Sequence, residues 1–133
     1  MPRETISIMV VPLTYQPDAP AALAGLRILD LSRLVAGNAI THVMADHGAE
    51  VIKIERPGVG DDLRNWKTRG VSTHWKVYRR NKKSVTLDLR TARGRAIFLD
   101  LAATAQVMSR ISNPARWRNG GLDRPNCTPA NPI

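Results

Sequence analysis

Residues 21–62 read AALAGLRILDLSRLVAGNAITHVMADHGAEVIKIERPGVGDD, and this stretch decides the fold. The apolar run at residues 26–31 predicts a β-strand, and the β-branched run at residues 51–55 predicts a second strand. A helix is predicted over residues 38–47, ending at Gly48, because one face repeats at helical spacing through Ile40, Val43, Met44 and His47. A strand–helix–strand unit this short predicts a parallel pair joined by a right-handed crossover.

The sequence beyond this unit predicts three further elements. Residues 84–89 alternate apolar with polar side chains, which is typical of a half-buried strand. Thr91 suits the N-cap position of a helix over residues 92–105, and a short helix near residues 73–80 joins the second and third strands. The expected fold class is therefore α/β, in the form of a partial Rossmann-like unit.

Ligands of open α/β sheets bind beyond the carboxyl ends of the strands, which are occupied here by residues 32–37 and 55–57. Gly58-Val59-Gly60, which follow the second predicted strand, are not a dinucleotide fingerprint, because no helix begins directly after them. We expect Asp61 and Asp62 to be solvated on this turn. No metal site is expected, because the histidines lack ligand spacing with acids or cysteine.

Composition allows at most one domain in 133 residues, and no apolar run approaches the ~20 residues of a membrane helix. Residues 1–22 are interrupted by prolines and are expected to form a flexible extension rather than a signal peptide. The single cysteine excludes an internal disulfide framework and fits a cytoplasmic location. After Met108 the periodicity disappears, so residues 109–133 are expected to form an irregular, disordered tail.

The net charge of +9 suits an anionic partner, and much of it lies between Lys67 and Lys83. Aromatic side chains at Trp66, Trp75 and Tyr78 accompany this basic cluster. A small basic nucleic-acid-binding module is therefore one candidate function. The cluster lacks the named nucleic-acid motifs, which makes nucleic acid the weaker of the two candidates.

The other candidate comes from a resemblance to the family III CoA-transferases, which include formyl-CoA and carnitine CoA-transferases and alpha-methylacyl-CoA racemase. Family-like motifs occur in order and at family spacing over residues 23–108, which we assign as the N-terminal segment of that family. They are Leu29-Asp30-Leu31-Ser32, Ala36-Gly37, His47-Gly48-Ala49, Val51-Ile52-Lys53-Ile54-Glu55-Arg56-Pro57, Gly60-Asp61 and Arg80-Asn81-Lys82-Lys83-Ser84 through Leu89.

The resemblance implies that CoA or acyl-CoA is bound as substrate, without a metal. It places Val35 and Ala36 in a loop near the thioester, and Arg56 near the adenine-phosphate end of CoA. It places Leu87 and Arg90 near the CoA nucleotide. From the residues alone, Arg56 suits a surface arginine at a strand end equally well, and Leu87 suits a core position better.

The resemblance also implies covalent catalysis by an aspartate that lies well beyond the matched segment, so we expect this chain to be a truncated, inactive transferase. The family forms interlocked homodimers, which we do not expect of a fragment. Suitable codons can be chosen for the tail so that the same DNA, read one base out of frame, encodes Glu-Asn-Phe-Lys-Pro-Gly. This sequence is similar to the family's continuation. We therefore expect a frameshift after Met108, with an ordinary disordered tail as the alternative.

Overall fold

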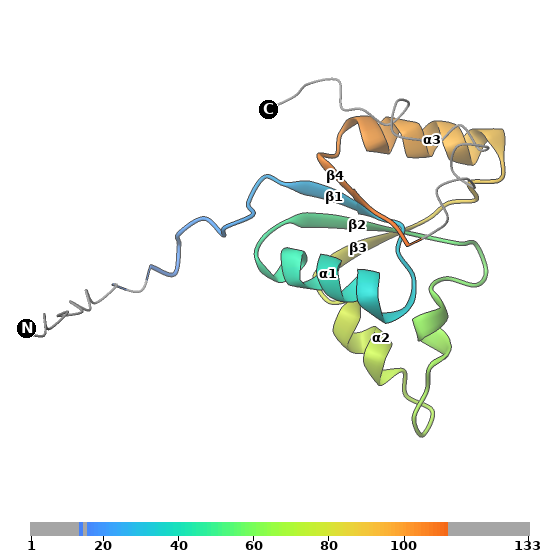
Figure 1. Cartoon of the computed structure of the whole chain (residues 1–133), viewed down its shortest axis with the longest axis horizontal. Helices are drawn as coiled ribbons and strands as arrows, with labels where there is room; N and C mark the ends of the chain where they lie inside the picture. Colours follow the sequence, from blue (N-terminus) through green and yellow to red (C-terminus); the bar gives the residue numbers. More distant parts are fainter. Residues whose placement is uncertain (1–13, 15, 112–133) are drawn as a thin grey trace, which may run out of the picture.

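The computed structural model describes residue 14 and residues 16–111, so nearly all of the expected irregular tail lies outside the described residues. Its centre is a four-stranded parallel sheet with the strand order β3-β2-β1-β4 (Figure 1). The strands are β1 (Arg27–Asp30), β2 (Glu50–Glu55), β3 (Lys82–Thr86) and β4 (Val107–Ser109). The helices are α1 (Leu34–Asp46), the 3-10 helix η1 (Asp62–Asn65), α2 (Thr73–Tyr78) and α3 (Ala92–Ala103).

The sheet is covered by α1 and α2 on one face and by α3 on the other (Figure 1). The α3 face is wholly apolar at its centre, where Leu29, Ile52 and Ile54 pack against Phe98 and Ala102. Alternation along each strand sends the neighbouring side chains to the opposite face. The expected α/β class with a parallel sheet is confirmed.

The face toward α1 changes character along the strands. Near their amino ends, Ile28 and Val51 pack with Ala45 and Ala49 in a second apolar cluster. Two residues further along each strand, the same face carries Asp30 and Lys53, and both are buried. The charged half of this face therefore lies next to the carboxyl ends of the strands.

Helix α1 begins at Leu34, four residues before the predicted start. Of its predicted apolar stripe, Met44 packs against the sheet, but Ile40 and Val43 do not. Ile40 and Val43 are 60% and 54% exposed. The buried face instead carries Asn38, which donates to Asp61 in the turn after β2, and Thr41, which donates to Asp30 of β1. Hydrophobic spacing located the helix correctly, but it did not identify the face that is buried.

The third strand also differs from its prediction. β3 pairs with β2 from Lys82 to Thr86, whereas the alternating pattern predicted residues 84–89. A fourth strand, β4, adds to β1 around Met108, where the sequence pattern had predicted the start of an irregular tail. Three residues are too few for a periodic signal, so pairing with β1 defines this strand rather than its own sequence. Within the described residues, no helix is long and apolar enough to cross a membrane.

Candidate functional site

The candidate site is the carboxyl edge of the sheet, where the structure brings most of the sequence-predicted residues together. Val35 and Ala36 lie in the first turn of α1, which follows β1, and Arg56 directly follows β2. Leu87 follows β3, and its N–H donates to the carbonyl of Glu55 across 3.0 Å. Arg56 and Leu87 are therefore neighbours at one edge.

Two exposed guanidinium groups share one carboxylate at this edge. Arg56 donates from Nη2 to Oδ1 of Asp62 at 3.0 Å. Arg33 donates from Nε to Oδ2 of the same carboxylate at 2.8 Å, and its Nη2 contacts that oxygen as well. Sequence reasoning missed Arg33, although its position directly after the first strand was the available signal. The pair leaves a net positive charge beside the N-terminus of α1.

Arg90 stands apart from this pair. Its guanidinium is strongly exposed and donates to both oxygens of Asp88, at 2.9 and 2.8 Å. These side-chain hydrogen bonds, with one from the Arg90 backbone, lower the pKa of Asp88 to about 2. The side chain of Leu87 packs against the apolar cluster beneath α3, so its interpretation as a core residue is confirmed.

Directly beneath the edge lies a buried charge cluster of Asp30, Lys53, Asp61 and Lys82. Lys53 Nζ lies 3.0 Å from Oδ2 of Asp61 and 3.6 Å from Oδ2 of Asp30, and donates to the carbonyl of Ser32 at 2.9 Å. Lys82 Nζ lies 3.0 Å from Oδ2 of Asp30. The four opposite charges compensate one another, which burial requires.

Neutral groups complete the bonding of Lys82. Its Nζ donates to the carbonyl of Asn38 at 2.9 Å and to Oγ1 of Thr41 at 2.6 Å. Burial lowers the pKa of Lys82, and the charge of Asp30 only partly offsets this effect. Burial alone would raise the pKa of Asp30, but the charges of Lys53 and Lys82 outweigh it and hold that pKa below its ordinary value.

Asp61 corrects the expectation that this turn is solvated, because its side chain is buried. Its Oδ1 accepts from the N–H of Leu63 at 2.9 Å, which caps η1, and from the N–H of Leu34 at 3.2 Å. Its Oδ2 accepts from the side-chain amide of Asn38 at 2.8 Å. Although burial would raise the pKa of Asp61, these hydrogen bonds and the charge of Lys53 lower it.

These bonds fix the turn that carries Val35 and Ala36. Leu34 has φ +62°, a left-handed conformation that non-glycine residues seldom adopt. Its N–H bonds to Asp61, and its carbonyl accepts from the amide of Asn38 at 2.5 Å. Asn38 thus holds the start of α1 in place. Strained backbone of this kind often accompanies function.

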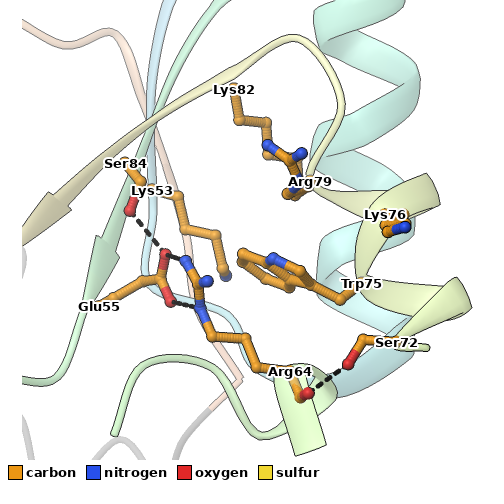
Figure 2. Close-up of a pocket in the computed structure, with 9 residues that line it drawn as sticks. All are labelled: Lys53, Glu55, Arg64, Ser72, Trp75, Lys76, Arg79, Lys82 and Ser84. Atoms are coloured by element: carbon orange, nitrogen blue, oxygen red, sulfur yellow. Dashed lines mark hydrogen bonds and ion pairs between the residues drawn. The ribbon is translucent and has the colours of Figure 1, made fainter. Parts of the chain in front are cut away.

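A cavity of 290 Å³ opens beside the charge cluster, between the sheet and α2 (Figure 2). Glu55 binds Arg64 through both oxygens at 2.8 Å and accepts from Oγ of Ser84 at 2.6 Å. Burial would raise the pKa of Glu55, but these donors lower it. Arg64 lies over the ring of Trp75, 4.1 Å from its centroid. The alternation of charged and apolar residues in Val51–Glu55 was the sequence signal for this lining.

Part of the basic cluster that suggested nucleic acid is engaged within the fold. The side chain of Lys82 is buried in the charge cluster, and Arg80 pairs with Asp46 at 2.9 Å. Trp75 is buried, so its face is not available for stacking on a base. Among the described residues, no group of three His, Cys, Asp or Glu side chains is arranged to hold a metal ion.

Comparison with known proteins gives consistent matches. A family model described as CoA-transferase family III matches residues 23–133. A succinyl-CoA:glutarate CoA-transferase from Mus musculus is 43% identical over 108 residues, covering 79% of this chain and 25% of the relative. A succinyl-CoA–D-citramalate CoA-transferase from Chloroflexus aurantiacus is 39% identical over 106 residues, covering 77% of this chain and 26% of the relative.

Solved structures show the same likeness. A hypothetical protein from Mycobacterium tuberculosis superposes with a TM-score of 0.75 at 38% identity, covering 80% of this chain and 30% of that one. The chain spans about a quarter of the length of the two CoA-transferases named above. The family match includes residues 109–133, the segment for which a shifted reading frame is predicted, and that hypothesis stays a prediction.

Proposed function

Because this chain belongs to the CoA-transferase family III, we propose that it serves the transfer of CoA between an acyl-CoA and a carboxylic acid, with its carboxyl edge binding the CoA nucleotide. The relatives named above are succinyl-CoA-dependent, which makes succinyl-CoA the first donor to test. CoA enters as a thioester substrate, and the proposal needs no metal.

The observation that carries this proposal is the pair of arginines on Asp62. Arg33 and Arg56 have side chains that are 51% and 52% exposed, so ligand oxygens can reach both guanidinium groups. A guanidinium binds phosphate through two parallel hydrogen bonds. One carboxylate balances only one of the two charges, and the diphosphate or 3′-phosphate of CoA supplies the missing negative charge.

The neighbouring elements suit the rest of the ligand. The first turn of α1, with Val35 and the exposed Ala36, provides a small-residue surface for the pantetheine arm. Leu87 contributes its backbone at the same edge, while its side chain serves the core. The exposed guanidinium of Arg90 is a further contact for the nucleotide. A phosphate oxygen would take the place of the Asp88 carboxylate that this guanidinium now binds.

Within the described residues, we assign the site to binding and not to covalent catalysis. A carboxylate nucleophile must reach the thioester carbon with a free oxygen lone pair. Asp30 and Asp61 are buried, and their oxygens accept hydrogen bonds or pair with lysine. We propose that the nucleophilic aspartate implied by the family lies outside the described residues, so that the described residues alone bind CoA without turnover.

The proposal extends to the cellular location and the oligomeric state of the protein. We place it in the cytoplasm, because acyl-CoA thioesters occur there and a single cysteine cannot form an internal disulfide. We propose that the described residues on their own do not form the interlocked homodimer that the resemblance implies. A sharp dimer peak in sedimentation velocity would contradict this.

Titration calorimetry with CoA tests the proposal. Arg56→Ala and Arg33→Ala should each weaken binding about tenfold, because each removes a charged hydrogen-bonding group worth about 1.4 kcal/mol. Arg27→Ala is the matched control, since Arg27 pairs with Glu50 at the opposite, amino edge of the sheet. It removes the same charge from the protein and should leave the affinity within about twofold.

Three outcomes would contradict the assignment. CoA binding that is unchanged in Arg56→Ala would remove that residue from the site. An equal loss in Arg27→Ala would show that net charge alone attracts CoA. Binding of a DNA duplex with a steep salt dependence, in the absence of CoA binding, would favour the nucleic-acid alternative.

A further inference from the structure

The cavity beside the charge cluster is lined by cations that the proposed CoA contacts do not use. Lys76 and Arg79 lie on the α2 side of the cavity, opposite the strand residues Lys53, Glu55 and Ser84 (Figure 2). The two cations are three residues apart, which places them on one face of the helical turn. Both side chains therefore reach the cavity from its α2 side.

Neither cation has a partner in the described part of the chain. The other charged groups of the lining do: Glu55 holds Arg64, and Lys53 and Lys82 are held by Asp30 and Asp61. Glu55 is the only carboxylate that lines the cavity among the described residues, and both of its oxygens accept from Arg64. The lining thus carries an excess of positive charge that the described protein does not neutralise.

The chemistry and size of the cavity restrict its ligand. Ser72 and Ser84 add hydroxyl groups to the lining, and Trp75 forms an apolar wall. A volume of 290 Å³ is just below the range of roughly 300–1,000 Å³ found for small-molecule sites. A phosphate or a short carboxylic acid fits this space, whereas a whole CoA molecule does not.

We propose that this cavity is a second anion site, which binds a compact oxyanion through Lys76 and Arg79. The ligand oxygens accept from the ammonium of Lys76 and from the guanidinium fork of Arg79. Phosphate and carboxylate share this chemistry, so a free phosphate or a short dicarboxylic acid is the source to be distinguished. The site is separate from the arginine pair on Asp62, which lies at the sheet edge and does not line the cavity.

Titration calorimetry of the full chain in chloride buffer, with inorganic phosphate in one arm and succinate in the other, tests the proposal. At least one of the two should bind, and Lys76→Ala and Arg79→Ala should each weaken that binding about tenfold. Both side chains are exposed, so their truncation leaves the fold intact. Lys67→Ala/Arg93→Ala is the matched control, because it removes two exposed cations that do not line the cavity, and it should change the affinity less than twofold.

A second readout separates this site from the CoA site. Arg56→Ala should weaken CoA binding and leave oxyanion binding unchanged, whereas Lys76→Ala should do the reverse. A weak site has a dissociation constant of about 1 mM. The proposal is overturned if neither anion binds at about 20 mM, which is about twenty times that constant. It is also overturned if the control variant loses as much affinity as Lys76→Ala, or if oxyanion binding depends on Arg56.

Discussion

Replacing Lys53 with methionine removes the central charge of the buried cluster while keeping an unbranched side chain of similar length. In the native protein, the ammonium lies 3.0 Å from an oxygen of Asp61 and 3.6 Å from one of Asp30, and the side chain is 2% exposed. The substitution leaves both carboxylates buried with less compensation. Removing one partner of a buried ion pair costs about 3–5 kcal/mol, a large part of the 5–15 kcal/mol that stabilises a typical domain.

Urea unfolding followed by far-ultraviolet circular dichroism measures this loss. With a denaturant slope of about 2 kcal/mol per molar, a loss of about 4 kcal/mol lowers the unfolding midpoint by about 2 M. Lys83→Met is the matched control. The side chain of Lys83 is 71% exposed, and its ammonium pairs with Glu50 at the surface. An exposed pair contributes at most about 1 kcal/mol, so this control should shift the midpoint by less than about 0.5 M.

The pH dependence gives the prediction a second test. The folded-state pKa values of Asp30 and Asp61 lie below the ordinary value of 3.8, so the stability that these groups contribute is present above 3.8 and lost as the pH falls through the folded values. Without Lys53, burial raises both pKa values. The difference in unfolding free energy between Lys53→Met and the native chain should therefore be largest near neutral pH and should narrow at acidic pH.

Two results would refute this reasoning. A Lys53→Met midpoint within the range of the Lys83→Met control would show that the cluster tolerates the lost charge, by water entry or by rearrangement. A destabilisation that is constant between pH 7 and pH 4 would show that it arises from altered packing and not from uncompensated carboxylates.

Three further predictions concern the surface and the gene. Arg90→Ala should raise the pKa of Asp88 from about 2 toward its ordinary value of 3.8, which an NMR pH titration of that carboxyl will show; an unchanged pKa would contradict the bidentate pair. Ile40→Lys/Val43→Lys places charge on an exposed apolar face of α1 and should reduce self-association in sedimentation velocity, whereas a native chain that is already a sharp monomer would leave nothing to reduce. Resequencing the coding DNA should reveal a base missing near codon 108, with an alternate frame that continues into family-like sequence; a frame that stops immediately would end the frameshift hypothesis.

The parallel sheet and its helices were predictable because their signals are local. Apolar runs located β1 and β2, helical spacing located α1, and the Thr91 N-cap located α3. The family-like motifs placed Arg56 at the carboxyl edge. Boundaries were less accessible: β3 begins at Lys82 because it pairs with β2, and β4 exists only as a partner of β1. Such pairing depends on residues distant in sequence, which a single-sequence pattern does not contain.

The charge cluster was not predictable for a related reason. Lys53 lies in an apolar run and Asp61 lies in a glycine-rich turn, and composition assigns the first to a strand and the second to solvent. Only the fold brings the two side chains within 3.0 Å. Arg33 was missed in the same way, since its partner Asp62 is 29 positions further along the chain.

The charge cluster also restricts how this protein can change over evolutionary time. On the α3 face, one aliphatic side chain can replace another, because neighbouring residues adjust to small differences in volume. Asp30, Lys53, Asp61 and Lys82 allow no such stepwise drift, since each single exchange to a neutral residue leaves a partner charged and buried. Their substitutions should be strongly non-additive, so that a viable apolar version of the cluster is reached only by changing several positions together. Among related sequences, these four positions should therefore either keep their charges or lose them jointly.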